Sequence, residues 1–122
     1  MAACSKEDVS AFIDSFKAKI MLNSIEYLII PPRGDHKNQN CMVELGLRHR
    51  DVANILLKLE IQHYSHTADD YRYPGKKLRV FGYNYLGEML YIKIAIRKKV
   101  FLVSFHPDEY GNLRNPNEYP YR

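Results

Sequence analysis

The sequence predicts an α+β fold in which an antiparallel β-sheet carries helices packed on one face. Three apolar runs, Lys77–Phe81, Met89–Ile96 and Val100–Phe105, show the alternation of residue types that strands have. Glycines and a cluster of basic residues separate these runs, as turns do. Amphipathic stripes with helical spacing lie in the first half of the chain. The predicted order is therefore α-β-α-α-β-β-β.

The first expected element is a helix over Val9–Ile20, where apolar residues recur at i, i+3, i+4, i+7 and i+11. Ser5 precedes it as an N-cap, and acidic residues occupy the first turn, where the helix dipole favours them. The segment Ser24–Ile30 is rich in β-branched and aromatic residues and ends at two prolines, which predicts a strand.

The middle of the chain alternates polar segments with short helices. Arg33–Asn40 has no periodicity and predicts a loop, whereas Cys41–Leu45 predicts a short helix that ends at Gly46. Arg50–Leu59 forms a second clear amphipathic pattern, so this helix and the first should pack on the apolar face of the sheet. Glu60–Gly75 is rich in His, Tyr and Asp and is expected to be a long connection, a kind of segment that is often functional.

Length and composition limit the classes of protein to consider. A chain of 122 residues predicts one domain, residues 1–122, whose C-terminal tail, residues 107–122, should be irregular and available to a partner or neighbouring subunit. Cys4 and Cys41 are too few for a disulfide framework and indicate free thiols in a reducing cytoplasm. We expect a cytoplasmic protein without a signal peptide or a membrane span, because no apolar stretch approaches ~18 residues.

The alternation also assigns side chains to the two faces of the sheet. Residues assigned to the apolar face are Leu78, Val80, Ile92, Ile94, Ile96, Phe101, Val103 and Phe105. Residues assigned to the opposite face are Lys77, Arg79, Phe81, Tyr91, Lys93, Ser104 and His106. If the strands pair antiparallel, this second face displays a basic site with a tyrosine and a histidine.

Positive charge is concentrated in the same region. The net charge is +4, and the segment from Tyr71 to His106 holds eight basic residues and a single acid, Glu88. A basic sheet with interleaved aromatic residues indicates a polyanionic ligand and favours nucleic acid. Lysines that protect an exposed strand edge from aggregation explain the charge about equally well.

Several side chains of this face are candidates for acid–base chemistry or for binding a phosphate or a base. His106 can act as a general acid or base near neutral pH, although a strand-end histidine often only bonds a turn carbonyl. Lys93 can hold a phosphate, and Tyr91 can bond a reacting hydroxyl or stack on a base. His63, Tyr64 and His66 in the long connection are candidates to border the site. No histidine or cysteine spacing indicates a metal, so we expect neither a metal nor a cofactor.

Six stretches together resemble one known family. They are ELGL at Glu44–Leu47, RDVANILLKL at Arg50–Leu59, Tyr64, LRVFG at Leu78–Gly82, GEMLYIKI at Gly87–Ile94 and VSFHP at Val103–Pro107. The pattern, of which YIK followed by SFH is the specific part, resembles the MqsR-like toxins of bacterial type II toxin–antitoxin systems. These toxins belong to the RelE-like group of small ribonucleases, so the resemblance implies a RelE-like fold over roughly Val9 to Asp108.

The resemblance implies a metal-independent, sequence-preferring endoribonuclease that cuts mRNA and is silenced by a cognate antitoxin, commonly a DNA-binding protein. The family's active-site tyrosine falls at Tyr91. Its basic residue after the last strand's SF pair falls at His106, where the founding toxin has a lysine. Its basic residue after the tyrosine of the long connection falls at Ser65 or His66.

We therefore expect Tyr91, His106, Lys93 and Arg79 to be catalytic. Tyr91 or His106 is the candidate base, and Lys93 and Arg79 hold the phosphate. The residues expected to contact RNA are Lys77, Tyr64, His66 and Ser104. The rival hypothesis is a non-catalytic nucleic-acid-binding module that uses the same face. The sequence leaves open whether the protein forms a homo-oligomer or a toxin–antitoxin complex.

Overall fold

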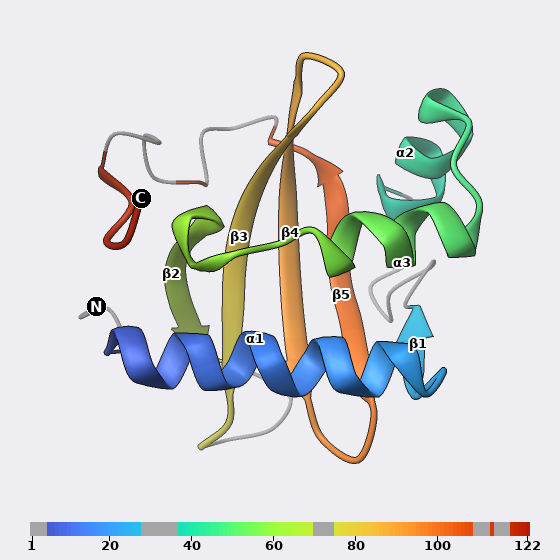
Figure 1. Ribbon diagram of the computed structural model, residues 1–122. Helices are drawn as coiled ribbons and strands as arrows, with labels where there is room; N and C mark the ends of the chain where they lie inside the picture. Colours follow the sequence, from blue (N-terminus) through green and yellow to red (C-terminus); the bar gives the residue numbers. More distant parts are fainter. Residues whose placement is uncertain (1–4, 28–36, 70–74, 109–112, 114–117) are drawn as a thin grey trace.

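The computed structural model describes residues 5–27, 37–69, 75–108, 113 and 118–122 (Figure 1). Its helices are α1 (Lys6–Met21), α2 (Lys37–Leu45), α3 (His49–Leu57) and the 3-10 turn η1 (Ile61–His63). Its strands are β1 (Ile25–Tyr27), β2 (Tyr64–Asp69), β3 (Lys77–Tyr85), β4 (Glu88–Ile96) and β5 (Val100–Pro107). The predicted α+β class is confirmed.

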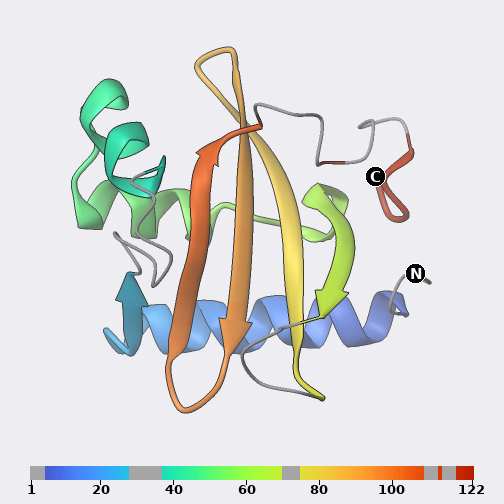
Figure 2. The same cartoon turned by 180° about the vertical axis from the view of Figure 1, so that it is seen from behind.

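The five strands form one sheet in the order β1-β5-β4-β3-β2. Strands β2 to β5 pair antiparallel, whereas β1 joins the edge of β5 in parallel. Helices α1 and α3 lie across one face, as Figure 1 shows, and in the described part of the chain no helix covers the face turned to the viewer in Figure 2. We call this second surface the open face.

Helix α1 forms for the reasons that its sequence indicates. The Ser5 hydroxyl accepts a hydrogen bond from the backbone N–H of Asp8 at 3.2 Å, which caps the first turn. Its buried residues are Val9, Ile13, Phe16 and Ile20, and these form the predicted stripe against the sheet.

Helices α2 and α3 also lie where the sequence predicts helices, with shifted ends. Gly46 follows α2 with φ +66°, the left-handed conformation that ends many helices and favours glycine. Cys41 on α2 is buried, and burial is the main cause that raises the pKa of its thiol to about 11. Val52, Ile55 and Leu56 bury the apolar face of α3.

The prediction that Glu60–Gly75 is an unstructured connection was wrong. This segment holds η1 and the edge strand β2, which pairs with β3 from Tyr64 to Asp69. An irregularity between Tyr64 and His66 interrupts the alternation that would have revealed the strand. Of the predicted strand Ser24–Ile30, residues 28–30 lie outside the described residues.

The assignment of β3 to the two faces was also reversed. Phe81 lies on the helix side of the sheet, where its ring packs 6.0 Å from that of Phe16 and 6.0 Å from that of Tyr64. Val80, opposite Lys93, lies on the open face with Leu78. Both faces of β3 carry apolar residues, so its alternation does not by itself identify the side that faces the helices.

A β-bulge corrects the prediction for β5. Lys93 pairs with Ser104 but Ile94 pairs with Leu102, so Val103 is the extra residue. Before the bulge, Leu102 points into the core, and Phe101 therefore lies on the open face rather than inside. After the bulge, Phe105 is in the core, as predicted.

No helix among the residues that the structure describes is long and apolar enough to cross a membrane. The same residues contain no group of three or more His, Cys, Asp or Glu side chains that could hold a metal ion.

The two phenylalanines provide a direct test of these faces. We expect Phe81→Ala to lower the free energy of unfolding by about 3–5 kcal/mol, because it empties a fully buried site. Phe101→Ala removes a half-buried ring on the open face and should cost only about 1 kcal/mol. Urea unfolding of both variants measures the difference, and equal losses would contradict the assignment.

Candidate functional site

The strand register brings four candidate side chains together on the open face. Tyr91 on β4 lies opposite His106 on β5, and Lys93 lies opposite Ser104. Directly opposite residues of an antiparallel pair point to the same side of the sheet. These four residues, Tyr91, Lys93, Ser104 and His106, are called the open-face cluster below.

Contacts within the cluster fix the position of Tyr91. The rings of Tyr91 and His106 are stacked, with centroids 5.4 Å apart and an interplanar angle of 21°. The Lys93 ammonium lies 5.5 Å from the centroid of the Tyr91 ring, within the range of a cation–π contact. The cluster therefore presents an aromatic hydroxyl, an imidazole and an ammonium side by side.

A backbone contact determines which nitrogen of His106 carries the proton. Nδ1 lies 2.9 Å from the carbonyl oxygen of Pro107. A carbonyl oxygen can only accept, so Nδ1 must donate, and the neutral ring then carries its lone pair on Nε2. The arrangement leaves Nε2 as the position that can take up a proton.

Tyr91 has an altered acidity. Burial is the main cause that raises the pKa of its hydroxyl from the ordinary value of 10.0, and the nearby carboxylate of Asp108 adds to it. Tyr91 is therefore protonated at neutral pH and can donate a hydrogen bond. Of the two candidate bases, this favours His106.

The C-terminal tail borders the cluster, which sequence reasoning missed. Leu113 packs with Tyr91 and Val80, and the Tyr119 hydroxyl occupies the space where a side chain of Gly82 would lie. Both tail residues are buried, so these two positions contact their own sheet. That the tail is also available to a partner or a neighbouring subunit stays a prediction. Gly82 is the feature of the sequence that could have indicated this contact, because an isolated glycine inside a strand often marks a place where another segment approaches the backbone closely.

Asp108 connects the tail to the sheet. Its backbone N–H donates to the carbonyl of Met89 at 3.0 Å, and its carboxylate accepts from the N–H of Leu113 at 3.3 Å. This carboxylate also adds to the effect of burial in raising the pKa of the Tyr119 hydroxyl, as it does for Tyr91. One acid thus influences both tyrosines.

The structure separates Arg79 and Lys77 from this cluster, contrary to prediction. Arg79 pairs with the core residue Ile94, and its guanidinium lies 4.9 Å from the ring centroid of Phe12 on α1. Lys77, two residues earlier, forms an ion pair with Asp69. Both belong to the helix side of β3, so the sequence-based assignment of this strand to the two faces was wrong.

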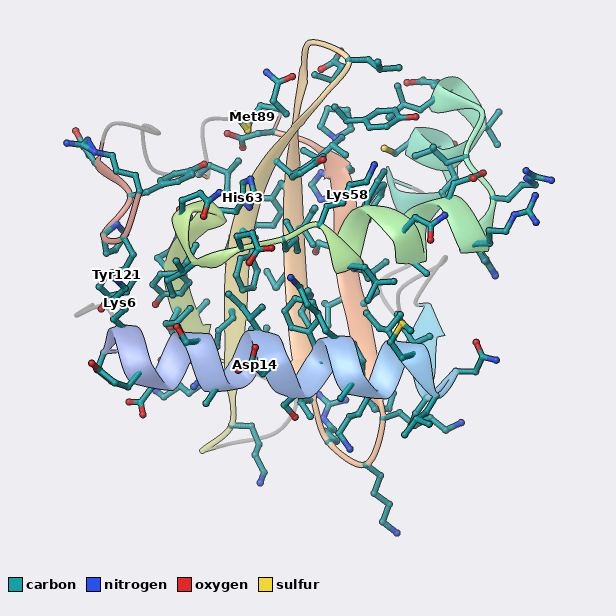
Figure 3. The ribbon with its side chains drawn as sticks, viewed as in Figure 1. Lys6, Asp14, Lys58, His63, Met89 and Tyr121 are labelled. Carbon is teal, nitrogen blue, oxygen red and sulfur yellow. The ribbon has the colours of Figure 1, made fainter. Side chains whose placement is uncertain are left out.

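Tyr64 is likewise not placed to contact RNA. It is fully buried, its hydroxyl is 2.5 Å from that of Thr67, and its ring stacks at 6.0 Å on that of Tyr121 in the tail. Figure 3 labels Tyr121 at this end of the chain. The expected loop is a strand here, and the tyrosine is directed into the core.

His66 lies on the open face but away from the cluster. It pairs with Val80, which in turn pairs with Lys93, so two strand spacings of roughly 10 Å in total separate it from the lysine. Ser65 and His66, the two candidates for the family's basic position, contact each other through the hydroxyl oxygen and Nδ1 at 2.9 Å. His66 can border a ligand that crosses the sheet.

The close approach of Tyr119 to Gly82 gives a test. We expect Gly82→Ala to cost about 1–3 kcal/mol of unfolding free energy, because the added methyl group overlaps the Tyr119 hydroxyl. In a Tyr119→Ala background the same change should cost much less. Urea midpoints of the four proteins give the coupling, and additive effects would show that the tail does not pack at this position.

The raised pKa of Tyr91 predicts a dependence of stability on pH. The folded state holds the phenolic proton more tightly than the unfolded state does, so this contribution is present below pH 10.0 and is lost as the pH rises through the folded pKa. We expect the unfolding free energy of the wild type to fall more steeply above pH 10 than that of Tyr91→Phe. Parallel curves from urea titrations at each pH would contradict this prediction.

One comparison identifies the family. A family model described as motility quorum-sensing regulator, toxin of MqsA, matches residues 17–107. No curated protein matches the chain. The matched region contains all five strands that the structure describes and the whole open-face cluster, and it ends at Pro107, the first residue of the tail. Because the match covers well over half of the sequence, the chain belongs to the MqsR toxin family, whose members are toxins of toxin–antitoxin systems.

Proposed function

We propose that this toxin is an endoribonuclease that cuts mRNA without a metal ion and is inhibited by a cognate antitoxin. The observation that carries the proposal is the joint position of Tyr91, His106 and Lys93 on the open face of the sheet. Metal-free RNA cleavage needs a base, a cation and an acid, and these side chains can supply all three.

The reaction begins at the ribose 2′-hydroxyl. Nε2 of His106, which holds the lone pair of the neutral ring, takes the proton of this hydroxyl. The 2′-oxygen then forms a bond to phosphorus, and the bond from phosphorus to the 5′-oxygen breaks. The products are a 2′,3′-cyclic phosphate and an end that carries a 5′-hydroxyl.

Lys93 and Tyr91 act on the phosphate. The Lys93 ammonium stabilises the negative charge that builds up on the phosphorane, and the Ser104 hydroxyl opposite it can bond a phosphate oxygen. The Tyr91 hydroxyl, protonated at neutral pH, donates its proton to the leaving 5′-oxygen. The resulting phenolate lies near the Lys93 ammonium and recovers its proton from His106 through water.

The tail borders the proposed cleavage site. Tyr91 is only 8% exposed, and Leu113 packs beside it. RNA that reaches the tyrosine hydroxyl therefore contacts the tail or displaces it. Arg79 and Lys77 are left out of the proposed catalytic set because they lie on the other side of the sheet.

The first test compares two histidines. We expect His106→Ala to lower the rate of RNA cleavage by the purified protein by about 10²–10⁴-fold, because it removes the base. His49→Ala changes an exposed histidine at the start of α3 and should cleave like the wild type. Cleavage of total RNA in chelator, mapped by primer extension, provides the readout. An inactive wild type that still binds RNA would favour the non-catalytic binding module.

The second test concerns the cation. We expect Lys93→Ala to lower the cleavage rate by about 10²–10³-fold, whereas Lys58→Ala, an exposed lysine on the helix side, should have no effect (Figure 3). Single-turnover rates at saturating protein separate loss of chemistry from loss of binding. Equal rates for the two variants would exclude Lys93 from the reaction.

A further inference from the structure

Strands β3 and β4 part at one end of the sheet. Their pairing ends at Arg79 and Ile94, although β3 begins at Lys77 and β4 continues to Ile96. At the same end β3 still pairs with β2 and β4 with β5, so each strand follows its other neighbour. A pocket of about 270 Å³, here called the basic notch, lies at this divergence. This end of β3 and β4 is the lower end of the sheet in Figure 1.

The notch is lined by cations. Lys76, Lys77, Arg79 and Arg97 border it, together with the ring of Phe12. Lys77 is paired with Asp69, and the exposed residues Lys98 and Lys99 follow in the β4–β5 turn. Nitrogen-tipped side chains project from this end of the sheet in Figure 3. The charged residues in the lining are all basic and a carboxylate is paired with one of them, Lys77, so the excess of positive charge at the hollow attracts an anion.

Two aromatic rings hold the arginines of the notch. The guanidinium of Arg79 lies 4.9 Å from the centroid of Phe12, and that of Arg97 lies 4.7 Å from the centroid of Phe101. Stacking occupies the flat face of a guanidinium, so recognition of a phosphate would use its N–H edge. Nε of Arg79 is buried and has no hydrogen-bond partner among the residues that the structure describes, and an anion would supply the acceptor.

The open face leads from the cluster to the notch. Tyr91, Lys93, Ala95 and Arg97 are alternate residues of β4 and its end, and Phe101 pairs with Ala95. Six residues of strand span roughly 20 Å from Tyr91 to Arg97, which a single strand of several nucleotides can cover. A polyanion that lies along the open face of β4 thus meets Lys93 first and then Arg97, which borders the notch from the open face. Arg79 borders the same notch from the helix side, where β3 and β4 no longer pair, so a phosphate seated between the two strands lies between the two arginines.

We propose that the basic notch binds a backbone phosphate of the RNA, several nucleotides away from the phosphate that Lys93 holds. The inference rests on the proposed function, since it extends the same substrate along β4. An acidic segment of a protein partner has similar charge, but the continuous line of β4 side chains from the cluster to the notch favours a strand of RNA.

The test measures binding of fluorescent RNAs with 2′-O-methyl riboses, which lack the attacking hydroxyl. We expect Arg97→Gln and Arg79→Gln each to weaken binding of a dodecanucleotide about tenfold and to leave that of a tetranucleotide unchanged. The dependence of log K on log salt should fall by about 0.7 for each lost phosphate contact. Arg50→Gln, an exposed arginine on α3, is the matched control. Urea unfolding of each variant verifies that the fold is retained.

The possible outcomes distinguish this inference from the proposed function. If the wild type cleaves RNA and the notch variants bind the dodecanucleotide like Arg50→Gln, the notch proposal is wrong and the nuclease stands. If the notch variants weaken binding as expected but the wild type never cleaves, the notch stands and the nuclease proposal fails. Normal RNA binding combined with weakened antitoxin binding would assign the notch to an acidic partner and overturn the proposal.

Discussion

The antiparallel pairing of β4 with both of its neighbours is the constraint on which the rest of the molecule depends. Because successive residues of this central strand point to opposite sides, Ile92 and Ile94 enter the core while Tyr91 and Lys93 face outward. The same hydrogen bonds therefore fix the packing against α1 and the geometry of the open-face cluster. A slip of one residue in the β4–β5 register would move Tyr91 away from His106, and it would disrupt the packing of the core at the same time.

The sequence predicted best the elements that have one clearly polar side and one clearly apolar side. The stripe of α1 and the alternation of β4 each have one polar and one apolar side, so their orientation follows from the residues alone. β3 has no such contrast, because Phe81 and Val80 are both fully buried on opposite faces. The Arg79 guanidinium, which charge alone would place in solvent, packs on a phenylalanine of α1 instead.

Features that depend on distant segments could not be read from the sequence. The bulge at Val103 exists only relative to β4, and its effect is that Leu102 rather than Phe101 enters the core. The tail contacts the sheet through Leu113 and Tyr119, which lie beyond the region that the family shares. Of the eight predicted site residues, Tyr91, Lys93, Ser104 and His106 lie together on one face. His66 lies on the same face but two strands away, and Arg79, Lys77 and Tyr64 lie on the helix side. Their roles toward RNA stay a prediction.

The stacking of Tyr91 on His106 couples the orientations of the two rings. Turning either ring about its side-chain bonds would break the stacking contact, so each ring favours one orientation of the other. Substitutions at the two positions should then be strongly non-additive, since loss of one ring already frees the second. A lysine at position 106 would keep a proton-carrying group there but would lose the flat partner of Tyr91. With histidine at position 106, one side chain both carries a proton and holds the ring of Tyr91 in place.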